Sequence, residues 1–183
     1  MIPDFELQIK DDLHRYLMAK GEVDDYFDKI LHRLIDAPDI EERWESIAES
    51  YMADGVREFA GYPTVSLGWM MYVGMAVAKL WDADWKQYAA LPDLYLFLRE
   101  PRGYDAMDEY IREKVLHLAP KAYADTEQLV GECASRTYSL LRHSGYEAGT
   151  KEAFRAYVAC LHQLYLMGAA VQLHRMGYHM VKA

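Results

Sequence analysis

The stretch VSLGWMMYVGMAVA at residues 65–78 decides the fold of this chain. Every position is apolar or glycine except Ser66, so a helix here has no polar face. Such a helix must be surrounded, either by other helices of its own chain or by a second subunit. Small residues that let another helix approach closely occur at Gly68, Gly74 and Ala78. We therefore expect an apolar helix over roughly 64–85 to be the central element, with a homodimer interface as the alternative.

Outside this stretch, apolar residues recur at the three- and four-residue spacing of an amphipathic helix, and no alternating strand-like run competes with them. The predicted helices include 4–20, 23–35, 39–59, 104–118, 121–143 and one capped by Thr150. Proline or glycine punctuates the boundaries between them. No flexible linker divides the chain. The sequence therefore predicts an all-α fold, in which residues 1–183 form a single-domain bundle of about seven helices around the central apolar helix.

Composition limits the cellular setting. Apolar residues make up 52% of the chain and charged residues 27%, which is typical of a globular protein. The amino-terminal residues lack the pattern of a signal peptide, and the run at 65–78 is too short to cross a bilayer. The two cysteines, Cys133 and Cys160, lie in helix-like apolar patterns and fit buried, reduced thiols. We expect a soluble cytoplasmic protein without a membrane segment.

The charge is concentrated in the first third of the chain. Residues 1–60 carry sixteen acidic and seven basic side chains, whereas residues 61–183 carry thirteen of each. A surplus of acid argues against nucleic acid as a partner, because phosphate binding requires lysine and arginine. It permits a basic protein partner, although an acidic surface can serve solubility alone. The expected interaction residues are Asp24, Asp25, Asp28, Glu41, Glu42, Glu45 and Glu49.

Aromatic and methionine side chains near the apolar helix leave a ligand pocket open as an alternative to core packing. Trp69 and Tyr72 lie on that helix, and His162 and Tyr165 lie on the last predicted helix. The sequence contains no motif for a particular cofactor, and we expect none. These four residues are the candidates for lining a pocket.

The best metal candidate is a line of residues at four-residue intervals in the helix predicted over 104–118. Glu109, Glu113 and His117 would share one helix face and could ligate one ion, although we favour a solvated face as the explanation of this spacing. The motifs of ferritin-like di-iron sites, zinc proteases, nucleophile elbows and phosphate-binding loops are missing from the sequence. We therefore favour a non-enzymatic role, while an enzymatic one stays open.

The sequence thus indicates a helical interaction domain. The favoured hypothesis is protein–protein interaction through the acidic first third or the apolar helix. The alternative is a small-molecule or metal-binding bundle that could be an enzyme.

Overall fold

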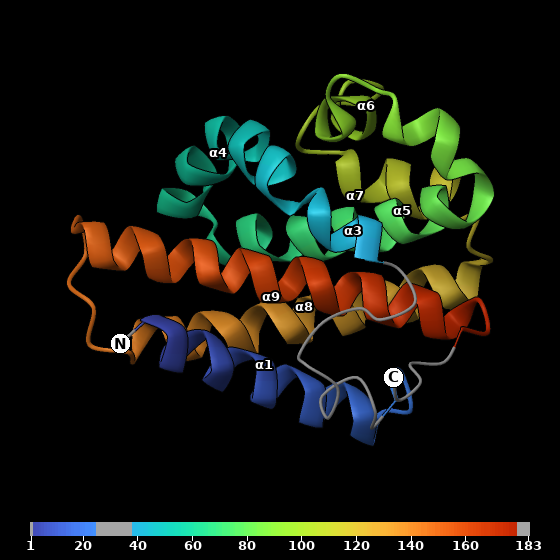
Figure 1. The fold of residues 1–183 in the computed structure, drawn as a ribbon. Helices are drawn as coiled ribbons and strands as arrows, with labels where there is room; N and C mark the ends of the chain where they lie inside the picture. Colours follow the sequence, from blue (N-terminus) through green and yellow to red (C-terminus); the bar gives the residue numbers. More distant parts are fainter. Residues whose placement is uncertain (1, 25–37, 179–183) are drawn as a thin grey trace.

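The computed structural model describes residues 2–24 and 38–178 of the chain. Every regular element in these ranges is helical, and the arrangement is shown in Figure 1. The elements are α1 (Ile2–Ala19), α3 (Pro38–Glu42), α4 (Trp44–Gly61), α5 (Pro63–Ala89), α6 (Leu94–Arg99), α7 (Met107–Tyr110), the π-helix η1 (Ile111–Val115), α8 (Pro120–Arg142) and α9 (Lys151–Arg175). The predicted all-α bundle around an apolar helix is confirmed.

Helices α5 and α9 form the centre of the bundle and contact each other more extensively than any other pair. Residues 70–78 of α5 and 163–173 of α9 are buried throughout, so both helices are enclosed on all sides along these stretches. Two glycines permit the close approach. A Cβ at Gly74 would overlap with the carbonyl of Tyr165, and a Cβ at Gly168 would overlap with that of Met71. The apolar helix is therefore core, which removes it as a surface for a second subunit.

The remaining helices cover this pair from two sides. Helix α1 packs against α9 and α8, and α8 also packs against α5. Helices α4 and α6 lie on the opposite side of the central pair (Figure 1). Apolar residues of α1 at helical spacing, such as Ile9, Leu13 and Leu17, are fully buried in this contact. This arrangement places the amino-terminal half of α1 beside the start of α4 and the middle of α9.

Two helix ends follow the sequence rules used to predict them. The Thr150 hydroxyl accepts a hydrogen bond from the Ala153 amide at 3.1 Å and caps α9. Helix α1 is followed by Gly21 in the left-handed region, with φ of 74°. The helix predicted over 23–35 lies outside the described residues beyond Asp24, and Val23 itself sits in a bend.

The segment 104–118 differs from its prediction. A continuous helix was expected there, but α7 begins only at Met107 and passes into a π-helical turn at Ile111. The helical path ends before His117, which has a positive φ of 52°. The wide turn coincides with Arg112, a cation only 2% exposed that points into the protein. Glu109, Glu113 and His117 are all exposed, as expected of a solvated face, whereas Arg112 beside them is buried.

Helix α9 is, among the described residues, the one helix with the length and hydropathy of a membrane span. Of its most apolar 18-residue window, 89% is buried inside the protein. A central core helix produces this pattern equally well, so the finding is weak evidence for a membrane. Cys133 and Cys160 are both free and fully buried, as predicted. Burial raises the pKa of Cys133 to about 12, which disfavours the reactive thiolate.

Candidate functional site

A cavity of about 890 Å³ opens between the start of α1, the α3–α4 region and the middle of α9. Its size falls within the range of small-molecule sites in proteins. Its most distinctive feature is five carboxylate residues from two separate parts of the chain. The lining residues are Pro3, Asp4, Glu6, Leu7, Lys10, Glu41, Glu42, Trp44, Glu45, His162, Gln163 and Leu166.

Several of these carboxylates lack a counter-charge. Within the described residues, Asp4, Glu42 and Glu45 form no ion pair, and Glu42 and Glu45 are exposed. The neighbouring cation, Arg43, does not compensate them. Its guanidinium donates to the Ala89 carbonyl and lies 5.6 Å from the Trp85 ring, away from the cavity. With five carboxylate residues against one lysine, Lys10, the cavity lining carries a net negative charge.

The aromatic wall of the cavity is rigid. The His162 imidazole stacks on Trp44 with ring centroids 4.9 Å apart, and its Nδ1 lies 3.5 Å from Glu6 Oε1. The other neighbour of Trp44 is Tyr165, at 5.4 Å between centroids. Tyr165 is fully buried and donates a hydrogen bond of 2.6 Å to the Ile40 carbonyl. These contacts fix the start of α4 against α9, so the cavity walls hold their positions.

The predicted interaction residues divide among three environments. Glu41, Glu42 and Glu45 line the cavity, and Glu49 is exposed one turn further along α4. Asp24 is half-buried, with a carboxylate oxygen 3.9 Å from His174 Nε2 at the far end of α1. Asp25 and Asp28 lie outside the described residues. The structure thus gathers three of the seven into one site.

The four predicted pocket residues do not line one pocket. Trp69 and Tyr72 border a separate groove of about 380 Å³ between α5 and α8, where the Trp69 indole donates to the Tyr104 carbonyl at 2.7 Å. His162 lines the acidic cavity instead, and Tyr165 lies in the core beneath it. The reason is the packing of α5 on α9, which turns these two pairs of residues to different sides of the bundle.

The three predicted metal ligands are not brought together either. Glu113 forms an ion pair with Arg102 at 2.7 Å, and this contact lowers the pKa of Glu113. The π-helical turn and the left-handed His117 break the common face that Glu109, Glu113 and His117 needed. Among the described residues, no group of three acidic, histidine or cysteine side chains is arranged to hold a metal ion.

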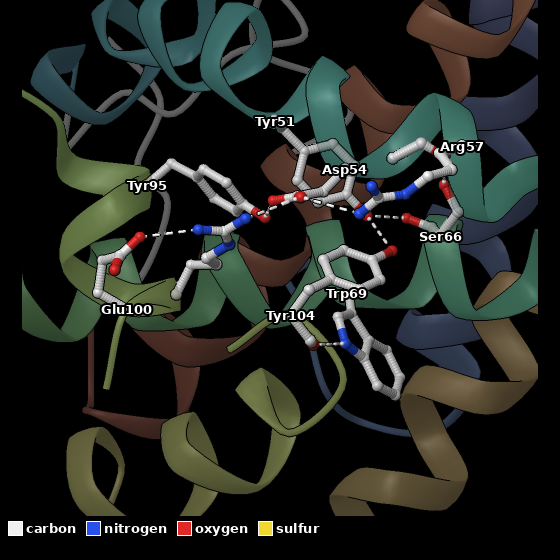
Figure 2. Close-up of polar contacts among 10 residues, drawn as sticks. Tyr51, Asp54, Arg57, Ser66, Trp69, Tyr95, Glu100 and Tyr104 are labelled. Carbon is white, nitrogen blue, oxygen red and sulfur yellow. Dashed lines mark hydrogen bonds and ion pairs between the residues drawn. The ribbon is translucent and has the colours of Figure 1, made fainter. Parts of the chain in front are cut away.

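A second polar cluster lies at the contact of α4, α5 and α6, and Figure 2 shows its side chains. Asp54, which is 4% exposed, accepts hydrogen bonds from Tyr95 at 2.7 Å and Arg99 at 3.0 Å. Beside it, the Tyr51 hydroxyl donates to the Ser66 carbonyl and lies 3.1 Å from the Tyr104 hydroxyl. Burial raises the pKa of Tyr51 and of Tyr95 well above the usual range of tyrosine. These hydrogen bonds join three helices, and among the described residues only Arg99 Nε of this cluster is buried without a partner.

A third cluster surrounds Arg112 of η1. Its guanidinium forms ion pairs with Asp108 at 2.7 Å and Glu127 at 3.0 Å, and its carbon lies 4.0 Å from the Tyr123 ring centroid. Burial raises the pKa of Asp108, and the neighbouring Arg112 opposes this effect. The cluster joins η1 to α8 and accounts for the inward turn of Arg112.

Sequence reasoning missed Asp4, Glu6, Lys10 and Gln163 as members of the acidic cavity. The charge count included the first three without assigning them to a site, because they lie more than thirty positions from Glu41 along the chain. Gln163 stands between His162 and Leu164 in an apolar helix and carries no charge signal. Only the packing of α1 on α9 reveals that these residues share one cavity.

Comparison of the chain with protein-family models, with curated proteins and with solved structures finds no match. The function is therefore argued from the geometry of the acidic cavity.

Proposed function

We propose that this protein binds a basic segment of a protein partner in the acidic cavity between α1, α4 and α9. The observation that carries the proposal is the convergence of five carboxylate residues on one cavity, three of them without a counter-charge among the described residues. Clefts lined by one sign of charge concentrate ligands of the opposite sign and speed their association.

The buried state of α5 supports the choice of this surface. The sequence left the apolar helix and the acidic residues as alternative interaction surfaces. Because residues 70–78 of α5 are buried beneath the neighbouring helices, this stretch offers no surface to a partner. The acidic residues around the cavity are accessible, with Glu42 and Glu45 exposed to solvent.

The spread of the carboxylates favours an extended polycation over a single ion. They come from α1 on one wall and from α3 and α4 on the other, and no three of the described acidic residues are arranged to hold one metal. A chain with several positive charges can contact both walls at once. A small cationic molecule shares this chemistry, and the cavity volume of about 890 Å³ suits one as well.

The test uses a fluorescently labelled basic peptide and a charge-neutralised variant, Asp4→Asn/Glu42→Gln/Glu45→Gln. Fluorescence anisotropy at low ionic strength should show binding to the unmodified protein, about tenfold weaker binding to the variant, and a further loss in high salt. The matched control, Asp105→Asn/Glu109→Gln/Glu152→Gln, removes the same number of charges from exposed positions away from the cavity. Equal weakening by the control and the cavity variant would refute a specific site.

A further inference from the structure

Gln163 lines the acidic cavity, and its side-chain oxygen has no hydrogen-bonding partner among the described residues. It lies on α9 and is only 5% exposed, and its buried Oε1 accepts no hydrogen bond from the part of the chain that the structure describes. A buried amide oxygen that lacks a partner costs folding free energy. Such a group calls for an explanation, and a ligand that supplies the missing partner is one.

The chemistry of this acceptor restricts the missing group. An amide oxygen accepts hydrogen bonds, and the surrounding carboxylates of Glu6, Glu42 and Glu45 favour a positive charge. Rotation of the amide by 180° exchanges its oxygen and nitrogen with little steric change. Gln163 can therefore turn its oxygen toward a donor that enters the cavity.

Between the two organic cations of proteins, the site favours guanidinium. A guanidinium carries five N–H donors in a planar fork, so it can pair with a carboxylate and still donate to a neighbouring oxygen. It is also more weakly hydrated than an ammonium, so it loses less hydration free energy when it contacts a buried acceptor. An ammonium suits the exposed rim, where its hydration is preserved.

Building on the proposed function, we propose that the cavity recognises an arginine side chain of the basic partner, with Gln163 Oε1 accepting a hydrogen bond from its guanidinium. The carboxylates of α1, α3 and α4 then neutralise the charge. The rim residues set the strength of attraction, whereas Gln163 sets the preference for arginine over lysine.

The experiment compares three labelled peptides that differ only in arginine, lysine or citrulline, and adds free acetyl-arginine amide as a competitor. The unmodified protein should bind the arginine peptide about fivefold more tightly than the lysine peptide, in keeping with one additional hydrogen bond. Citrulline, the neutral isostere, should not bind. Competition by acetyl-arginine amide at concentrations similar to the peptide's would identify a free small molecule as the source of the guanidinium.

The variant Gln163→Met keeps the length of the side chain and removes its acceptor. It should bind both basic peptides equally, with an unfolding midpoint no lower than that of the unmodified protein. A second variant, Gln163→Glu, retains an acceptor oxygen and adds charge, so it should keep the arginine preference and bind more tightly.

The outcomes separate the two proposals. Equal binding of arginine and lysine peptides by the unmodified protein, or an arginine preference that survives Gln163→Met, would overturn the role of Gln163 and leave the acidic site intact. Failure of every basic peptide to bind would overturn the proposed function itself.

Discussion

Gly74 of α5 and Gly168 of α9 mark the crossing of the two central helices, and each faces a backbone carbonyl of the other helix. The space beside both is closed, since a Cβ at either position would overlap with that carbonyl. Main-chain atoms of two packed helices cannot move aside as a flexible side chain can. The contact therefore depends on the missing side chains at both positions.

Replacement of either glycine by alanine should destabilise the protein. Gly74→Ala and Gly168→Ala are each expected to lower the free energy of unfolding by roughly 3 kcal/mol, because the helices must separate to relieve the overlap. Urea denaturation monitored by circular dichroism measures this. Gly131→Ala is the control, since no atom lies within 4 Å of the added Cβ, and it should stabilise α8 by up to about 1 kcal/mol. Equal effects at all three positions would contradict the close crossing.

Loss of the buried Asp54 carboxylate should also destabilise the fold. Asp54→Asn weakens the hydrogen bonds from Tyr95 and Arg99 and removes the buried one of the two carboxylates with which Arg99 pairs. We expect a loss of about 2 kcal/mol in unfolding free energy. Glu100→Gln, which removes a more exposed ion pair of Arg99, should cost less than about 0.5 kcal/mol. Thermal unfolding of the two variants distinguishes a buried network from a surface contact.

Arg112 offers a test of the π-helical turn. Arg112→Met fills similar space but leaves the half-buried Asp108 carboxylate without its ion pair, so the unfolding free energy should fall by roughly 3 kcal/mol. Arg112→Lys keeps the positive charge but lacks the planar guanidinium. It therefore cannot pair with both Asp108 and Glu127 while stacking on the Tyr123 ring. Its expected effect is intermediate. If lysine proved as good as arginine in chemical denaturation, the stacked geometry would be irrelevant to stability.

Alkaline pH should destabilise the protein through its buried thiols and phenols. Burial raises the pKa of Cys133 from 9.0 to about 12, and it raises that of Tyr51 and Tyr165 well above 10.0. Because the folded state keeps protons that the unfolded state releases, this stability is complete below pH 9 and is lost as the pH rises toward the folded pKa values.

Each such group contributes a slope of up to about 1.4 kcal/mol per pH unit. Urea denaturation at pH 7, 9, 10 and 11 should therefore show a steep decline above pH 9. Cys133→Ala removes one titrating group, so the unfolding free energy should decline less steeply with pH above pH 9. This change in slope is expected whatever the effect of the substitution at pH 7. A stability that stays constant to pH 11 would show that these groups titrate alike in both states.

The fold was predictable because it depends on local and pairwise rules. The apolar stretch at 65–78 required enclosure, the small residues at Gly68 and Gly74 indicated close neighbours, and Thr150 marked a helix start. The structure agrees with each of these. The segment 104–118 was not predictable in the same way, because its π-helical turn accompanies the burial of Arg112 among Asp108, Glu127 and Tyr123. A polar residue with tertiary partners overrides local periodicity.

The candidate site was only partly predictable. Glu41, Glu42 and Glu45 stood out by charge, whereas their association with Asp4 and Gln163 depends on how α1 packs against α9. Asp4 and Gln163 are more than 150 positions apart, and both are distant in the chain from Glu41, so no local signal links them. The same reason explains why Trp69 and His162, both chosen as pocket residues, line different cavities.

The enclosure of α5 by α9 has a consequence for biosynthesis. Of the described helices, α9 is the last to be translated, whereas α5 and the inner face of α1 depend on it for burial. During translation, the apolar stretch at 65–78 leaves the ribosome before α9, the helix that buries it, has been synthesised. The nascent chain must therefore hold this surface exposed or loosely collapsed until residues 151–175 emerge, so its final packing waits for the synthesis of α9.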